Sequence, residues 1–73
     1  EKTKQNGGHK MYRSKLASLI EDAMNECITF GQGITRHEST SVQADWTEEE
    51  NEIQITIFEN HAVRFSYTET VNI

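Results

Sequence analysis

Apolar and polar residues alternate most clearly over two neighbouring segments, residues 52–58 and 62–71. Apolar side chains recur at every second position, as Ile53, Ile55 and Ile57 in the first segment and as Val63, Phe65 and Tyr67 in the second. A period of two predicts β-strands, because alternate residues of a strand point to the same face. Asn60 lies in the short polar segment between them and predicts a hairpin turn.

A third strand is predicted over residues 41–46, where Val42, Ala44 and Trp46 share one face. Its start is left open as far back as Ile34, since residues 31–40 show little pattern. The acidic segment 47–51 is predicted to be the turn that leads into the next strand. Phe58 breaks the alternation and is expected on the polar face or in the turn.

A different period marks residues 10–30, where the apolar positions are spaced three and four apart. They are Tyr12, Leu16, Leu19, Ile20, Ala23, Cys27 and Phe30. This spacing keeps one apolar stripe on a 3.6-residue period and predicts a helix whose stripe covers the sheet. Gly31 directly follows and is the expected C-cap.

Together these elements predict an α+β domain over residues 10–73, with one helix on a three-stranded antiparallel meander. Residues 1–9 show no periodicity and are expected to form a flexible basic leader. Only 34% of the 73 residues are hydrophobic. A core of this size rarely supplies more than ~3–5 kcal/mol. Cys27 is the single cysteine and excludes an internal disulfide, so we expect a homodimer that forms through an unprotected sheet edge.

Charge is distributed unevenly along the chain, whose formal net charge is −5. Five of the seven cations fall within residues 1–17, whereas residues 18–73 carry eleven carboxylates against Arg36 and Arg64 alone. The body of the domain is therefore strongly acidic and follows a short basic arm. No apolar run approaches the ~20 residues that span a bilayer, and the single cysteine is typical of a reducing compartment. We expect no membrane association and a cytoplasmic location.

Candidate catalytic and metal-binding residues are few. The three histidines, His9, His37 and His61, and Cys27 do not fall at the short spacings of zinc sites. Cys27 lies on the predicted buried stripe, where a thiol is usually inert. Gly31 and Gly33 follow a helix instead of preceding one, which argues against a phosphate-binding loop. We therefore expect neither an enzyme nor a bound cofactor or metal.

The excess of carboxylates is the strongest functional feature of the sequence. Too few cations lie nearby to pair with them, and repulsion among unpaired charges costs stability. A basic partner would explain why they are present, whereas the simpler interpretation is a soluble surface. The candidate partner-binding residues are Glu21, Asp22, Glu26, Asp45, Glu48, Glu49, Glu50, Glu52 and Glu59.

This profile resembles the small acidic proteins that bacteriophages use in host takeover. The resemblance rests on size, on a helix with a short sheet, and on the acidic stretches at residues 21–22 and 48–52. Some proteins of that type are DNA mimics that occupy the DNA-binding surface of host proteins such as HU-like nucleoid proteins. The resemblance implies a non-enzymatic inhibitor that binds a basic DNA-binding protein of the host cell and does not itself bind nucleic acid.

Two alternatives remain open. The basic arm could serve a small nucleic-acid-binding or regulatory module, through Lys2, Lys4, Lys10, Arg13 and Lys15. The chain could also be a dimeric structural adaptor in which the charge has no specific role.

Overall fold

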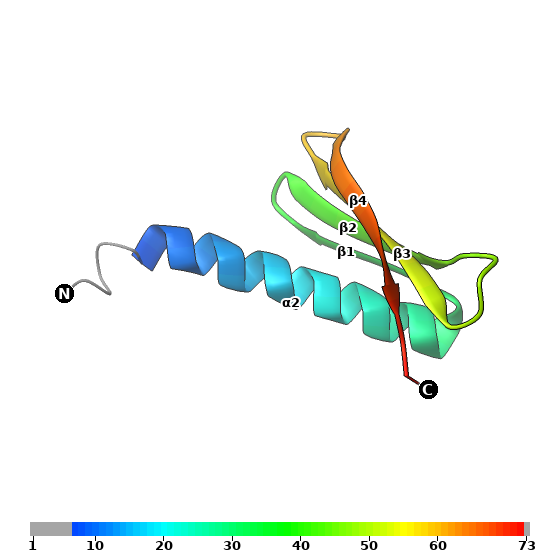
Figure 1. The fold of residues 1–73 in the computed structure, drawn as a ribbon. Coiled ribbons are helices and arrows are strands. Elements are labelled where there is room, and N and C mark those ends of the chain that lie inside the picture. The colour runs from blue at the N-terminus through cyan, green and yellow to red at the C-terminus, as the bar shows by residue number, and fades with distance from the viewer. Residues whose placement is uncertain (1–6, 73) are drawn as a thin grey trace.

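One helix and a four-stranded antiparallel sheet form two layers in the structure, a computed structural model that describes residues 7–72 and side chains from residue 15 onward (Figure 1). The elements follow in the order α2 (Gly7–Phe30), β1 (Gln32–His37), β2 (Thr40–Trp46), β3 (Glu52–Glu59) and β4 (Ala62–Thr70). The strands lie in the sheet in chain order, each antiparallel to the next. The predicted α+β class is confirmed.

The prediction of three strands is wrong, because residues 32–37 form an additional strand, β1. A two-residue turn at Glu38 and Ser39 joins β1 to β2, and Glu38 adopts a left-handed φ of 58°. The sequence pattern concealed this strand because β1 is an edge strand that buries little. Gly33 is its only buried residue, and Ile34 is 56% exposed. An edge strand of this kind has no apolar alternation to detect.

Helix α2 begins at Gly7, three residues before the predicted start and inside the expected leader, and the rest of that leader, residues 1–6, lies outside the described residues. The predicted C-cap is confirmed: Gly31 has a φ of 96° and its amide donates a 2.8 Å hydrogen bond to the Cys27 carbonyl. Phe30 was expected on the buried stripe but is 79% exposed. It is the last helical residue, directly before the Gly31 cap.

Close contact between α2 and the sheet occurs at Gly33. A Cβ atom at this position would clash with the Ala23 carbonyl oxygen and would lie 2.8 Å from the Glu26 Cβ. The absence of a side chain therefore lets the helix backbone rest directly on β1. A hydrogen bond of 2.7 Å from the Thr35 hydroxyl to the Leu19 carbonyl fixes the same two elements one helical turn away.

Eight buried apolar residues form the core between the helix and the middle of the sheet. They are Leu19, Ala23, Cys27, Val42, Ala44, Ile53, Ile55 and Ile57. This confirms the predicted inner faces of β2 and β3. The indole of Trp46 donates a 3.2 Å hydrogen bond to the Cys27 carbonyl and closes one end of the core.

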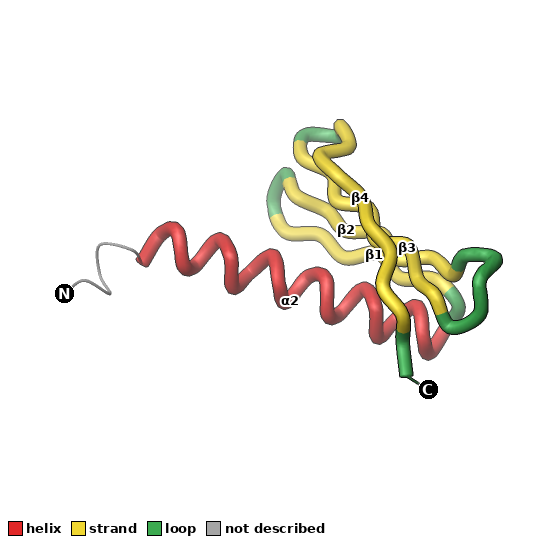
Figure 2. The backbone as a smooth tube through the Cα atoms, viewed as in Figure 1, coloured by secondary structure: helices red, strands yellow, loops and turns green. Residues whose placement is uncertain are grey.

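Strand β4 lies outside the area that the helix covers, contrary to the prediction that the helix stripe spans the whole sheet. Figure 2 shows the helix alongside the sheet. Among the described residues, the α2 backbone lies close to β1 and β2, contacts β3 and has no close contact with the β4 backbone. No residue of β4 is fully buried, and Val63 and Phe65 are 59% and 51% exposed. Val63 also departs from the predicted face. A bulge beside Phe58 pairs Val63 with Phe58, whereas Phe65 and Tyr67 pair with core isoleucines.

The turn between β3 and β4 contains Asn60 and His61, both with positive φ, of 55° and 69°. Two consecutive left-handed residues are typical of the type I′ turn that joins twisted hairpin strands. This confirms the turn predicted at Asn60. Asparagine suits such a conformation, whereas histidine adopts it at some cost.

Candidate functional site

Six carboxylates gather at the end of the sheet where β2 and β3 are joined. The strand register places Asp45 near the end of β2 and Glu69 opposite Ile53, and the β2–β3 loop and the first residue of β3 supply the others. We call this group the acidic end: Asp45, Glu48, Glu49, Glu50, Glu52 and Glu69. The helix C-terminus lies at the same end of the molecule (Figure 1). No lysine or arginine lies in the strands or loop of this end.

The opposite end of the sheet has a different charge. Arg36 lies beside the β1–β2 turn, and Arg64 lies near the β3–β4 turn. Two carboxylates, Glu38 and Glu59, balance these two cations. The sheet is therefore polarised along its strands, with uncompensated negative charge at one end and balanced charge at the other.

The nine predicted partner-binding residues do not form one continuous surface. Asp45, Glu48, Glu49, Glu50 and Glu52 belong to the acidic end, whereas Glu21 and Asp22 are exposed on the helix. Glu59 ends β3, seven residues after Glu52. At about 3.3 Å per residue these two carboxylates stand some 23 Å apart along the strand. The structure thus brings five of the nine together.

Four of the nine carboxylates accept hydrogen bonds from neutral groups instead of lying free. Asp45 accepts a bond of 3.0 Å from the Gln43 amide, and Glu52 accepts one of 2.7 Å from the Thr47 hydroxyl. These bonds orient the side chains but leave their charge in place, since neither donor is a cation. The other two, Glu26 and Glu59, have structural partners described below.

Glu26, one of the predicted partner-binding residues, lies apart from the acidic end and contacts β1. Its carboxylate turns toward the sheet and accepts a 3.1 Å hydrogen bond from the Ile34 amide. Ile34 belongs to the edge strand β1, so this amide points away from β2 and would otherwise face solvent. Glu26 therefore covers part of one sheet edge, and its carboxylate has a structural partner in β1.

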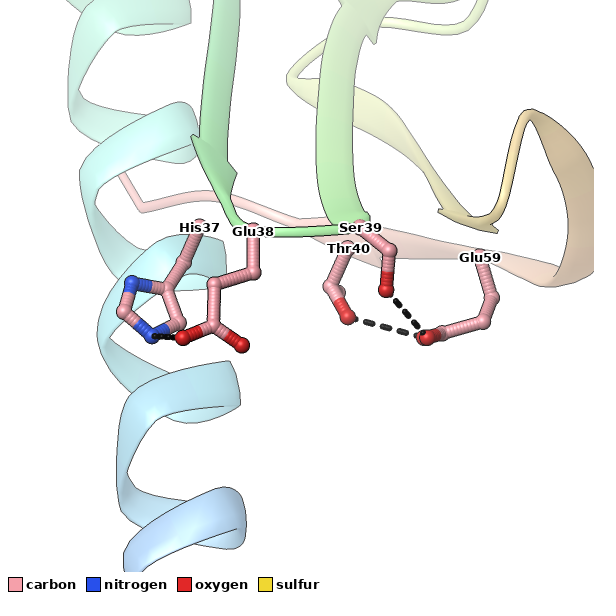
Figure 3. Close-up of polar contacts among 5 residues, drawn as sticks. All are labelled: His37, Glu38, Ser39, Thr40 and Glu59. Carbon is pink, nitrogen blue, oxygen red and sulfur yellow. Dashed lines mark hydrogen bonds and ion pairs between the residues drawn. The ribbon is translucent and has the colours of Figure 1, made fainter.

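Glu59 lies in a polar cluster that joins the two turns at the other end of the sheet (Figure 3). The hydroxyls of Thr40 and Ser39 each donate a 2.8 Å hydrogen bond to its carboxylate, and the Asn60 amide donates to the Ser39 carbonyl at 2.9 Å. The hydrogen bond from Thr40, then that from Ser39, and to a smaller extent attraction to Arg64, hold the pKa of Glu59 below its ordinary value. These contacts give Glu59 a structural role in holding the turns together.

The same cluster contains His37, whose Nε2 lies 3.6 Å from the carboxylate of Glu38. Both side chains are largely exposed, and the pair carries opposite charges only when the histidine is protonated. The hydroxyls of Ser39 and Thr40 donate to Glu59 and not to His37. Neither hydroxyl is therefore hydrogen-bonded to the His37 imidazole.

Among residues 15–72, the His37–Glu38 contact is the sole ion pair. The carboxylates of the acidic end therefore have no cationic partner within the part of the chain whose side chains are described. The same residues contain no group of three histidine, cysteine, aspartate or glutamate side chains placed to hold a metal ion.

Cys27 is a free thiol in the core, with no exposed surface. Burial, and to a smaller extent the negative charge of Asp45, raise the pKa of this thiol above its ordinary value. Both effects disfavour the thiolate, which is the reactive form. The structure confirms the predicted position of Cys27 on the buried side of the helix.

Glu69 is a member of the acidic end that sequence reasoning did not select. The alternation of β4 places it on the same face as Tyr67, and the hairpin register then sets it opposite Ile53. Counting along both strands from the Asn60 turn would have located it, but the bulge beside Phe58 makes such a count unreliable by one residue.

Comparison of the chain with protein-family models, curated proteins and solved structures finds no match. Within residues 7–72, no helix combines the length and the apolar character needed to cross a bilayer.

Proposed function

We propose that the chain is a non-enzymatic protein that binds a basic nucleic-acid-binding protein through its acidic end and competes there with DNA. The observation that carries this proposal is the collection of six carboxylates at one end of the sheet with no lysine or arginine among them. Carboxylates fixed on a folded frame can stand where DNA phosphates would meet lysine and arginine side chains of the partner.

Two further features strengthen the negative potential at this end. The helix C-terminus lies there, its last turn contains no basic residue, and a helix C-terminus carries a partial negative charge. Glu48, Glu49 and Glu50 are exposed and occupy consecutive positions of one loop. Like charges this close repel one another, so a cationic partner would relieve a cost that the free protein bears.

The polarised sheet also gives the interaction a direction. A basic surface is attracted to the acidic end, whereas the balanced charge at the opposite end offers it little. Complementary potentials of this kind accelerate encounter and depend on ionic strength. The proposed partner is therefore a protein whose DNA-binding surface is lined with lysine and arginine, such as an HU-like nucleoid protein. In this proposal the chain is a phage protein of host takeover, and the partner is a protein of the host.

The test is displacement of fluorescently labelled duplex DNA from a purified HU-type nucleoid protein, followed by anisotropy. We expect the chain to release the DNA and to do so less well as salt is raised. Replacing Glu48, Glu49 and Glu50 together by Gln should weaken displacement by about 10–100-fold, at roughly 0.5–1 kcal/mol for each charge. The matched control neutralises Glu21 and Asp22 on the helix and should change little.

Three results would refute the proposal: DNA that stays bound at every concentration, displacement that is indifferent to salt, or equal losses for the loop and helix variants. A chain lacking residues 1–9 separates the alternative. It should still displace DNA if the acidic end is responsible, whereas direct DNA binding that depends on those residues would favour the nucleic-acid-binding module.

A further inference from the structure

The two edges of the sheet differ in how they are protected. On β1, the Glu26 carboxylate holds the Ile34 amide, and the Thr35 hydroxyl is bonded to the Leu19 carbonyl of the helix. On β4, the outer edge of residues 62–70 has no hydrogen-bond partner among the described residues. An unpaired strand edge is a ready template for another strand.

The inner face of β4 is only partly covered. Phe65 and Tyr67 lie on the same face as the core isoleucines, with ring centroids 6.2 Å apart, but only Tyr67 packs against the core. Phe65 is 51% exposed and Val63, next to the bulge, is 59% exposed. Tyr67 is partly buried against the core, so the exposed apolar surface beside the free strand edge is that of Phe65 and Val63. Exposed apolar side chains next to an unpaired strand edge indicate an interaction surface.

We infer that β4 is the interface with a second copy of the chain, paired antiparallel across a two-fold axis near Ser66. An antiparallel strand edge can pair with its own copy across a two-fold axis. Whenever residue i of the first copy lies opposite residue j of the second, residue j of the first copy lies opposite residue i of the second. With the axis at Ser66, Phe65 of one copy lies opposite Tyr67 of the other. Directly opposed aromatic side chains are among the favourable cross-strand pairs.

Charge complementarity selects this occupant and this orientation. Glu69 belongs to the acidic end, whereas Arg64 lies toward the balanced end of the same strand. Antiparallel pairing brings Glu69 of one copy opposite Val63 of the other, next to its Arg64. A parallel arrangement would instead place the two acidic ends side by side, where like charges repel. The two-fold axis is perpendicular to the sheet, so the helices of both copies lie on the same face of the combined sheet. Phe65 and Tyr67 of both copies lie on that face, between the two helices.

The mass of the full chain in solution, measured by sedimentation equilibrium from low micromolar to submillimolar concentration, tests this inference. We expect a monomer–dimer equilibrium in which Phe65→Lys raises the dissociation constant by about tenfold or more, because a lysine at a strand edge opposes pairing. Ile34→Lys is the matched control: it introduces the same charge at a similarly exposed position on the other edge strand, and it should leave the dimer intact.

A monomeric wild type across this range, or a dimer that Ile34→Lys disrupts while Phe65→Lys does not, would overturn the inference. Hydrogen exchange of the unmodified chain provides a measurement that does not depend on a variant's folding. Amides of β4 should exchange more slowly as protein concentration rises, and loop amides of residues 48–50 should not change. Exchange of β4 that is independent of concentration contradicts a β4 interface. The DNA-displacement assay varies carboxylates of the β2–β3 loop and of the helix, not residues of β4, so the two proposals can fail separately.

Discussion

Gly33 offers the most direct test of how the helix is seated on the sheet. Replacing it by Ala adds one methyl group at the place where α2 crosses β1. That methyl would clash with the Ala23 carbonyl oxygen and lie 2.8 Å from the Glu26 Cβ. The carbonyl belongs to the helix backbone and cannot rotate away as a side chain can. The helix must therefore shift, which disturbs its packing against Val42 and Ala44 in the core.

Insertion of a methyl group into a packed site costs about 1–3 kcal/mol, and a backbone clash belongs at the upper end of that range. For a domain of this size, 1 kcal/mol lowers the melting temperature by about 4–8 °C, so a cost near 3 kcal/mol predicts a decrease of about 12–24 °C. The contact between Glu26 and the Ile34 amide should weaken as well, since it depends on the same spacing of helix and strand.

The assay is thermal unfolding followed by circular dichroism, together with the fluorescence of Trp46, the single tryptophan, which lies beside the helix end. Gln32→Ala is the matched control. Gln32 lies in the same strand, and its side chain is exposed and is not part of the core. A Gly33→Ala variant that melts within a few degrees of the control would show that the helix does not rest on this residue.

Three further predictions follow from single contacts. Thr40→Val removes the largest contribution to the lowered pKa of Glu59, so an NMR titration should show that pKa rising toward its ordinary value. A carboxylate whose pKa is lowered by folding stabilises the fold at pH above its unfolded-state pKa, and this stabilisation is lost as acid protonates Glu59. The Thr40→Val variant should therefore lose less stability than the wild type on acidification. An unchanged pKa of Glu59 would contradict the assignment. His61→Gly places glycine after Asn60 at a left-handed position and should raise the free energy of unfolding in urea by about 0.5–1 kcal/mol, whereas a loss of stability would argue against the turn geometry. Cys27 should react with a thiol-specific disulfide reagent far more slowly in the native protein than in urea, and equal rates would show that the thiol is not buried.

The elements with strong periodicity could be predicted from the sequence, and those without it could not. The β3 strand and the helix could be predicted because each buries one face, which leaves regularly spaced apolar residues: the isoleucines of β3 and the helix stripe from Leu16 to Cys27. Strand β1 could not be recognised, since it contributes Gly33 and backbone contacts to the core instead of apolar side chains. The exposure of β4 could not be predicted either, because its alternation is that of a buried strand, whereas the helix packs mainly on β1 and β2 at the far edge of the sheet.

The candidate site was predictable in composition but not in arrangement. The acidic loop at Glu48, Glu49 and Glu50 is evident in the chain, and the structure adds Asp45 and Glu69 to it through strand register. Glu26 and Glu59 resembled members of the same surface in sequence, yet each has a local partner: a free amide for Glu26 and two hydroxyls for Glu59. Such partners lie 8 to 20 residues away along the chain, so only the fold reveals them.

The hydrogen bond from the Ile34 amide to Glu26 also bears on how many copies can associate. Strand addition that used both edges of the sheet would have no natural end and would build fibrils. In the proposed dimer the β4 edges of both copies are paired, and the outer edges are the β1 strands, where Glu26 holds the Ile34 amide. We therefore expect replacement of Glu26 to favour polymers over the proposed dimer, because it would free an amide on the remaining edge.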